Sequence, residues 1–363
     1  MYIKELELKN FRNYEDLNIE FDENINFIIG NNAQGKTNLI ESIFMCSMGK
    51  SFRTSKDSDL IGFEKDFTKI KLTAQKQLFP TAIEIIIKKD QGKSIKIDGM
   101  SISKASDLLD NLYIVIFSPE DLKIVKDEPE KRRKFIDREL CVLKPYYFDS
   151  ITNYKKVILQ RNNYLKEKNI DSTVLDIWDI QLAKYGAKII SMRSEFIEKL
   201  NKISSFIHNN ITNKKEILKI EYEPNVKTKN NLENSLYNAL KKSQENDLRL
   251  RTTTRGPHRD DISFFIDGIN VRNFGSQGQQ RTAALSLKLA ELDLIKEETG
   301  EDAILLLDDV MSELDATRQE FLIKTLSDIQ LFITTTEITE SLKDTLSYSK
   351  VFTVENGKII SIK

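Results

Sequence analysis

The chain has 363 residues, of which 40% are hydrophobic and 31% are charged. This length predicts about two domains, each long enough to bury its own core. The 55 Lys and Arg are balanced by 56 Asp and Glu, so the net charge of -1 gives no general attraction to nucleic acid. Any contact with DNA must therefore come from a local basic patch.

Metal binding and membrane insertion are not expected from the composition. Cys46 and Cys141 are the only cysteines, and with only two histidines they do not have the spacing of a zinc site. No apolar run approaches the roughly 18 residues that a membrane helix needs. The first residues carry charges at Lys4, Glu5 and Glu7, so no signal peptide is recognisable. We expect a cytoplasmic protein with no membrane contact.

The first third of the chain is predicted to be mainly β-structure with one helix. Apolar runs and alternating patterns indicate strands, and several end at glycine or at an Asp-Gly turn. The expected strands are 2–8, 19–21, 24–29, 69–74, 81–88, 94–97 and 113–117, and the expected helix is 35–48. The strand 24–29 leads directly into this helix through a glycine-rich turn.

The middle of the chain has a helical pattern, and the last third returns to α/β. Pro129 begins a basic helix, and residues 148–250 show long helical periodicity. Beyond them we expect a hairpin at 263–266, a helix at 279–296, strands at 303–307 and 331–334, and a final hairpin at 351–362. The sequence therefore predicts an α/β fold with one lobe made from both ends, 1–117 plus 262–363. A mainly helical lobe, 118–261, is inserted in it.

The turn after the strand 24–29 has the pattern G-x-x-x-x-G-K-[ST] of a phosphate-binding P-loop. Its glycines let the backbone wrap around phosphates, where N–H groups and a helix N-terminus bind anions. Lys36 is expected to reach the β- and γ-phosphates of ATP, and Thr37 to bind Mg²⁺. The predicted nucleotide-binding residues here are Gly30, Asn31, Asn32, Ala33, Gln34, Gly35, Lys36 and Thr37.

The buried strand at 303–307 ends in two acidic residues, as a Walker B strand does. Asp308 is expected to hold Mg²⁺ together with Thr37, and Asp309 lies where a carboxylate polarises the attacking water. Two solvated acids after a buried strand are common, so the functional interpretation depends on the P-loop. We expect Lys36, Asp308 and Asp309 to form the catalytic set.

A third motif precedes the helix at 279–296. Ser276, Gln277, Gly278 and Gln279 resemble the signature sequence of ABC ATPases, in which a serine hydroxyl and glycine backbone contact a γ-phosphate. By itself the pattern would indicate only a helix N-cap. Its place between the P-loop and the Walker B strand is the order found in this class, and it favours a nucleotide-binding role.

Two segments after the Walker B strand refine the class. Residues 312–315 (SELD) resemble the D-loop of ABC ATPases. Residues 334–336 (TTT) lie where transporter-type members carry a switch histidine, and Thr336 could act only as a weaker γ-phosphate sensor. The missing histidine argues against a transporter ATPase.

Together with the P-loop, residues 9–14 (KNFRNY) resemble the start of the SMC and RecF group of DNA-associated ABC ATPases. Further stretches, spread nearly from end to end, are similar to the RecF family within that group. They are 49–54 (GKSFRT), 117–122 (FSPEDL), 129–137 (PEKRRKFID), 256–261 (GPHRDD) and the run from the signature to Walker B. Residues 142–250 add nothing to the resemblance.

The resemblance implies a recombinational repair protein with ATP and Mg²⁺ as cofactors. Members of the RecF family bind DNA at gaps or junctions, work with RecR and RecO, and promote RecA loading, with weak ATP hydrolysis. Asp309 replaces the glutamate usual in ABC ATPases, as expected for this family. Because its side chain is one methylene shorter, we expect it to position water less well and turnover to be slow.

One chain carries one P-loop and one signature, which face opposite ways in this class. A complete site then needs two chains, with Ser276 of one copy closing on ATP held by Lys36 of the other. We therefore expect an ATP-dependent homodimer that buries two ATP molecules.

Two basic clusters are candidates for DNA contact. Lysine and arginine there would contact phosphates without reading sequence. The alternative for the second cluster is a solvated helix face, with Arg133 and Asp137 as an i,i+4 pair. We expect reversal of Arg132 and Arg133 to Glu to weaken DNA binding. The first cluster is Lys50, Arg53 and Lys56; the second contains Lys131, Arg132, Arg133, Lys134 and Arg138.

Other functions stay open at this point. ATP could be structural in a scaffold whose role is partner docking on the helical lobe. A nuclease would need an added acidic metal domain, for which the chain has no room. The roles of Arg255, His258 and Arg259 as nucleotide-sensing or structural residues are also open.

Overall fold

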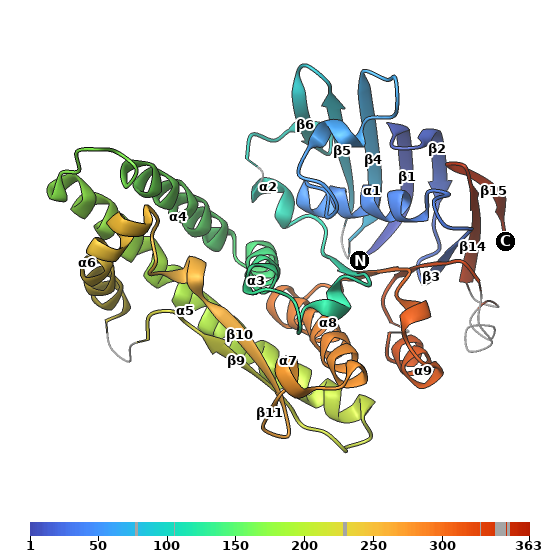
Figure 1. Cartoon of the computed structure of the whole chain (residues 1–363). Coiled ribbons are helices and arrows are strands. Elements are labelled where there is room, and N and C mark those ends of the chain that lie inside the picture. Colours follow the sequence, from blue (N-terminus) through green and yellow to red (C-terminus); the bar gives the residue numbers. More distant parts are fainter. Residues whose placement is uncertain (77–78, 105, 228–230, 327, 338–345, 347–348) are drawn as a thin grey trace. The chain divides into compact units, whose positions relative to one another are not determined.

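The computed structural model describes all residues except 77–78, 105, 228–230, 327, 338–345 and 347–348. The chain divides into two compact units (Figure 1): unit 1 is Met1–Asp121 with Ile295–Lys363, and unit 2 is Leu122–Leu294. The first lobe was predicted to resume at residue 262. The division instead lies at residues 294 and 295, inside the long helix α8 (Gln277–Thr299).

Unit 1 contains an antiparallel sheet in the order β2-β1-β4-β5-β6-β7. In β4, every second residue of the sequence FTKIKLTAQ is buried, so one face packs on the core and the other meets solvent. The strands are β1 (Tyr2–Phe11), β2 (Tyr14–Glu20), β4 (Phe67–Gln75), β5 (Pro80–Lys88), β6 (Gly92–Ile97) and β7 (Met100–Ser101). The predicted short strand 19–21 is the end of the longer β2.

The second sheet of unit 1 has the order β15-β14-β3-β13-β12-β8. It is parallel except for the terminal hairpin β14–β15, and its central strands are almost continuously apolar because both faces are buried. Its members are β3 (Ile25–Ile29), β8 (Ile114–Phe117), β12 (Ile304–Asp308), β13 (Leu331–Thr335), β14 (Ser349–Glu355) and β15 (Lys358–Ile362).

Helix α1 (Lys36–Met48) joins the two sheets in one core, lying across the antiparallel strands in Figure 1. Its buried Leu39, Ile43 and Phe44 belong to a cluster that contains residues of both sheets. The helix ends at Gly49, whose φ of 64° is the left-handed conformation that glycine adopts at little cost. Shorter helices of the unit are α2 (Ser106–Leu109), α9 (Ala316–Thr325) and the 3₁₀ turns Asp57–Leu60 and Met311–Glu313.

Unit 2 is mainly helical. Asp171 caps α5 and Asn231 caps α6 through side-chain oxygens that accept backbone N–H groups. Besides α8, its helices are α3 (Pro129–Leu143), α4 (Pro145–Tyr164), α5 (Ser172–Ile211), α6 (Leu232–Leu250) and α7 (Val271–Phe274). The 3₁₀ turn Pro257–Arg259 follows α6, and the turn Asp121–Lys123 begins at the boundary between the units.

The helical pattern predicted over 148–250 is interrupted by a strand that the sequence analysis did not predict. β9 (Leu218–Glu223) pairs with β10 (Asp261–Ile266), which also pairs with β11 (Ile269–Asn270) in a three-stranded sheet. In Figure 1 this sheet lies along α5. Residues that pair across this distance along the chain leave no local signal.

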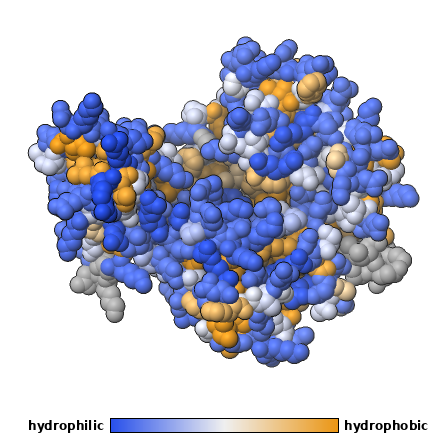
Figure 2. Space-filling view, viewed as in Figure 1, coloured by the Kyte–Doolittle hydropathy of each residue, from blue (hydrophilic) through white to orange (hydrophobic). Residues whose placement is uncertain are grey.

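The face seen in Figure 2 is largely polar, with apolar side chains in places. No helix in the described ranges is long and apolar enough to span a membrane.

Candidate nucleotide-binding site

The predicted P-loop lies between β3 and α1 in unit 1. Gly30 has no room for a side chain, because a Cβ there would lie 2.4 Å from the carbonyl oxygen of Val354 on the neighbouring strand. Gly35 has a φ of 120°, which only glycine adopts readily, and it precedes the first turn of α1. Both predicted glycines are therefore required by backbone geometry, and α1 begins with its N–H groups toward this loop.

Lys36 is 3% exposed, and its ammonium is held by weak partners. Its Nζ donates to the carbonyl oxygens of Gly30 at 2.8 Å and Asn31 at 3.2 Å. The nearest carboxylate oxygen, of Asp309, is 3.8 Å away. A buried ammonium is costly unless it is paired. The position of Lys36 in the loop therefore suits an anion that the loop's N–H groups also bind.

Thr37 and Asp308 meet, although 271 positions separate them in the sequence. Thr37 Oγ1 donates to Asp308 Oδ1 at 3.0 Å, and Thr334 Oγ1 donates to the same oxygen at 3.0 Å. Burial is the main cause that raises the pKa of Asp308, against these two hydrogen bonds, which lower it. A hydroxyl and a buried carboxylate are oxygen ligands of the kind Mg²⁺ prefers. The residues thus fit the predicted magnesium site.

Asp309 follows the strand β12 in a left-handed conformation with φ of 53°. Its N–H donates to Thr334 Oγ1 at 2.8 Å, and its side chain is 37% exposed. Aspartate tolerates this backbone conformation better than longer residues do. A carboxylate oxygen of Asp309 lies 3.8 Å from Lys36 Nζ, so this side chain is on the side of the P-loop.

Thr334 is a site residue that the sequence analysis did not single out. It contacts both acids of the Walker B strand, whereas Thr336 is exposed one position beyond β13. The parallel pairing of two buried strands, which only the structure shows, sets Thr334 directly opposite Asp308. A hydroxyl at that position was therefore the better candidate.

A polar network supports the P-loop from outside. Asn13 Nδ2 donates to the carbonyl oxygen of Gln34 at 3.0 Å, and Tyr14 donates to that of Gly35 at 3.1 Å. From the last hairpin, the N–H of Asn356 donates to Gln34 Oε1 and that of Gly357 to its carbonyl oxygen. The loop is thus fixed by residues from both ends of unit 1.

The first predicted DNA cluster gives a mixed result. Arg53 is bonded to Asn38 at 2.7 Å and forms an ion pair with the buried Glu41, which Arg12 also binds. This arrangement places Arg53 beside the helix that follows the P-loop, in a structural pair. Lys50 and Lys56 are exposed and Arg53 is 42% exposed, and the contact of all three with DNA stays a prediction.

Arg132 of the second cluster is not available to a phosphate in this structure, and its prediction as a DNA contact is corrected. Its side chain is 1% exposed and forms two hydrogen bonds to Asp261, at 2.7 and 2.8 Å. Its remaining nitrogen donates to carbonyl oxygens of Ile124 and Asp127. Reversal to Glu would therefore disrupt the interior. Arg133 is half-buried and donates to the carbonyl oxygen of Asp260.

The signature residues lie in unit 2. Ser276, Gln277 and Gly278 are exposed at the start of α8. The N–H of Gln279 donates to Ser276 Oγ at 3.2 Å, and the N–H of Ser276 donates to Gln279 Oε1 at 3.0 Å. This reciprocal capping box fixes the turn while Ser276, Gln277 and Gly278 remain exposed.

The structure distinguishes the surroundings of Arg255, His258 and Arg259, whose roles the sequence left open. His258 Nε2 lies 2.9 Å from the carbonyl oxygen of Thr253, so it carries the hydrogen, and Nδ1 accepts from Tyr154 at 2.8 Å. Burial lowers the pKa of His258 to about 4, so the ring is neutral and structural. Arg259 contacts the Thr253 carbonyl oxygen, and Arg255 is exposed.

A P-loop before a helix, a facing Walker B acid and a parallel sheet define the head of an ABC-type ATPase. The RecF/RecN/SMC N terminal domain family matches residues 2–360. The chain is 46% identical to the DNA replication and repair protein RecF of Clostridium kluyveri over 364 residues, covering all of both chains. It is also 46% identical to that of Clostridium perfringens (strain SM101 / Type A), covering 99% of each.

Solved structures agree with these relatives. The recombination mediator protein RecF with ATPrS, in the RecFOR pathway, matches with a TM-score of 0.92 and 39% identity, over 99% of this chain and 97% of the other. An Smc head bound to the C-winged helix domain of ScpA is 17% identical with a TM-score of 0.55, over 98% and 94%, and shows the fold alone. The chain belongs to the RecF family of DNA replication and repair proteins.

Proposed function

We propose that this chain is an ATP-dependent DNA-binding recombinational repair protein whose two copies close around ATP. The observation that carries the proposal is the incomplete site of unit 1. Lys36, Thr37 and Asp308 are assembled on one side, but no signature residue belongs to that unit. The signature turn of unit 2 is exposed and already capped, as a surface that closes on the nucleotide of a second copy would be.

Each residue then has a defined role in the ATP-bound dimer. Loop N–H groups and Lys36 bind the phosphates, and Thr37 and Asp308 hold Mg²⁺, which neutralises phosphate charge when bound. Ser276 and Gly278 of the second copy contact the γ-phosphate, so its loss on hydrolysis releases the dimer. Asp309 orients water, with slow turnover because of its short side chain.

The relatives support the biological context of the proposal. The RecF structures that match over the whole chain are recombination mediators of the RecFOR pathway, solved with ATPrS or ATP. On this basis we propose that the chain works with RecR and RecO at DNA gaps or junctions where RecA is loaded. The exposed basic residues proposed to contact DNA phosphates are Lys50, Arg53 and Lys56.

The test is the molar mass by light scattering in ATP with Mg²⁺ and in ADP with Mg²⁺. We expect the mass to double in ATP for the wild type and to stay that of one chain for Ser276→Arg, whose side chain blocks the closing surface. Turnover measured in the same samples should be slow. A wild-type protein that stays monomeric in ATP would reject the shared site, and ATP would then have a structural role in a scaffold.

A further inference from the structure

The Gln279 side chain is held from two directions within unit 2. Its Oε1 accepts the N–H of Ser276, as described above, and its Nε2 donates to Glu216 Oε1 at 3.0 Å. Because both ends of the amide are bonded, its orientation is determined. Glu216 thus acts on the signature turn through one side chain.

Glu216 itself is fixed by a tight turn after α5. Asn213 and Lys214 have φ values of 52° and 61°, and the N–H of Lys214 donates to the carbonyl oxygen of Asn209 at 2.7 Å. Two adjacent residues in the left-handed region reverse the chain sharply, at a conformational cost. The neighbouring Ile217 is bonded through its N–H to Asp267 at 3.1 Å.

The second oxygen of Glu216 is bound by His208, in the last turn of α5. His208 is fully buried, with Nε2 3.2 Å from Glu216 Oε2 and Nδ1 3.1 Å from Ser286 Oγ on α8. Burial lowers the pKa of His208 and so favours the neutral ring, although the hydrogen bond and charge of Glu216 oppose this shift. A carboxylate only accepts, so Nε2 carries the hydrogen. Ser286 Oγ, which contacts Nδ1, donates its own hydrogen to the carbonyl oxygen of Thr282 at 2.8 Å.

We propose that His208 and Glu216 are positioning residues that hold Gln279, and through it Ser276, in the conformation that closes on ATP. The chain of bonds begins on α8 at Ser286 and returns to the start of the same helix at Ser276. Both ends of the relay are therefore on one rigid helix, while its middle is supplied by α5 and the turn that follows. This inference rests on the proposed function for the role of Ser276, and it specifies what keeps the closing surface ordered before ATP arrives.

Amide hydrogen exchange of the monomer, without nucleotide, tests the relay directly. In Glu216→Ala, Gln279 loses its second anchor, so we expect exchange across residues 271–282 to accelerate about tenfold, the effect of one lost hydrogen bond to a charged group. Glu216→Gln keeps an acceptor for Gln279 and should retain most of the protection. His208→Phe keeps an apolar ring but no donor, and should give an intermediate result.

The matched control is Glu198→Ala, a 71%-exposed glutamate on α5 whose partner is Lys202. It should leave exchange at the signature turn unchanged. Equal exchange in Glu216→Ala and Glu198→Ala would overturn the proposal. Fast exchange in Glu216→Gln as well as in Glu216→Ala would also overturn it, because loss of protection despite a retained acceptor indicates a general loss of structure.

The same variants are then compared for ATP-dependent doubling of mass. We expect Glu216→Ala to need about tenfold more protein for half-dimerisation, with nucleotide affinity of the monomer unchanged. If Glu216→Ala dimerises at the same protein concentration as wild type, the positioning role of Glu216 is wrong, whereas the proposed function is unaffected. If the wild type itself does not dimerise, the proposed function fails, whereas the exchange measurement still decides whether Glu216 orders the turn.

Discussion

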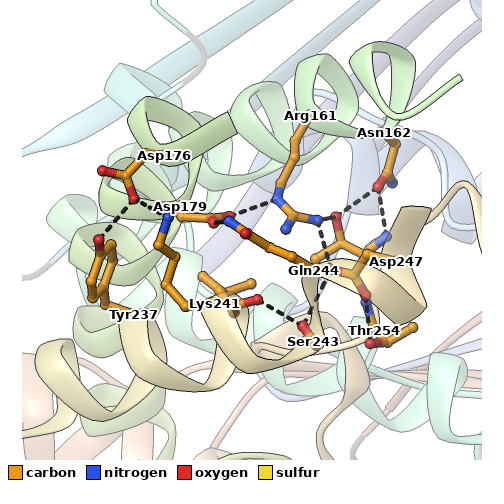
Figure 3. A network of polar contacts seen from close by, with 12 residues as sticks. Arg161, Asn162, Asp176, Asp179, Tyr237, Lys241, Ser243, Gln244, Asp247 and Thr254 are labelled. Atoms are coloured by element: carbon orange, nitrogen blue, oxygen red, sulfur yellow. Dashed lines mark hydrogen bonds and ion pairs between the residues drawn. The ribbon is translucent and has the colours of Figure 1, made fainter. Parts of the chain in front are cut away.

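The two units bury positive charge in different ways. In unit 2, Arg161 forms bonds of 2.8 Å to both Asp179 and Asp247, each fully buried, in a network that includes Gln244 and Ser243 (Figure 3). In unit 1, the buried Lys36 has two carbonyl oxygens and a carboxylate at 3.8 Å.

The difference separates structural charges from ligand-binding ones. A guanidinium whose charge is neutralised by two buried carboxylates has no electrostatic reason to bind an anion. An ammonium among carbonyl oxygens, at the start of a helix, gains much from one. Burial of a basic residue is therefore not by itself a sign of function, and the strength of its partners decides. Arg132, which donates two hydrogen bonds to Asp261, is a structural charge by this criterion.

Replacing Arg161 by Leu should have the largest effect on stability. Two buried carboxylates would lose their cation, which costs about 3–5 kcal/mol of the free energy of unfolding. Urea unfolding followed by circular dichroism measures this loss. Lys202→Ala, which breaks an exposed pair on α5, is the control and should cost less than about 0.5 kcal/mol. Equal stability of the Arg161 variant and wild type would contradict the distinction drawn here.

Replacing Lys36 by Ala should affect ligand binding more than stability. We expect the affinity for ATP to fall about 100-fold, since a charge-assisted contact to phosphate is lost in a dry site, while unfolding changes by less than about 1 kcal/mol. Binding of a fluorescent ATP analogue and urea unfolding give the two values, with Lys50→Ala as the exposed control. A large loss of stability with unchanged affinity would reverse the assignment of Lys36.

Glu291 provides a smaller, pH-dependent test in unit 2. Burial, and then the charge of Glu139, raise the pKa of Glu291 from its ordinary 4.5 to about 8, although Lys288 lies 2.7 Å away. A carboxyl whose pKa is higher in the folded state contributes stability below its unfolded pKa, and this is lost as pH rises through the folded value. The wild type should therefore become less stable between about pH 4.5 and pH 8.

Glu291→Gln removes that titration but keeps an oxygen for Lys288. We expect the fall in Tm between pH 6 and pH 9 to be smaller by several degrees than in wild type, because a carboxyl no longer ionises in the interior. Glu198→Gln, at an exposed position, should show the wild-type pH dependence. Parallel curves for Glu291→Gln and wild type would rule out Glu291 as the titrating group.

The sequence predicted the parts of the site that depend on neighbouring residues. Glycines at 30 and 35, a lysine and a threonine at the start of a helix, and acids at the end of a buried strand specify local backbone and chemistry together. The predicted helix 35–48 agrees with α1, and the paired strands place Thr37 against Asp308 as expected.

What the sequence could not predict depends on distant pairing. Neither the strand β9 nor the burial of Arg132 can be inferred without their partners, Asp261 among them, which lie far along the chain. A basic helix gives the number of its charges but not which of them faces inward. Thr334 was missed for the same reason, since its role comes from the strand beside it.

The position of β3 in its sheet has a consequence for synthesis on the ribosome. Its two neighbours are β13 and β14, so the P-loop strand emerges early and stays unpaired until the end of the chain follows. Unit 2 is continuous in sequence and can fold as soon as residue 294 has emerged. The inserted unit can therefore fold before the parallel sheet of the unit that contains it is complete, and the nucleotide site can form only after β13 and β14 have been synthesised.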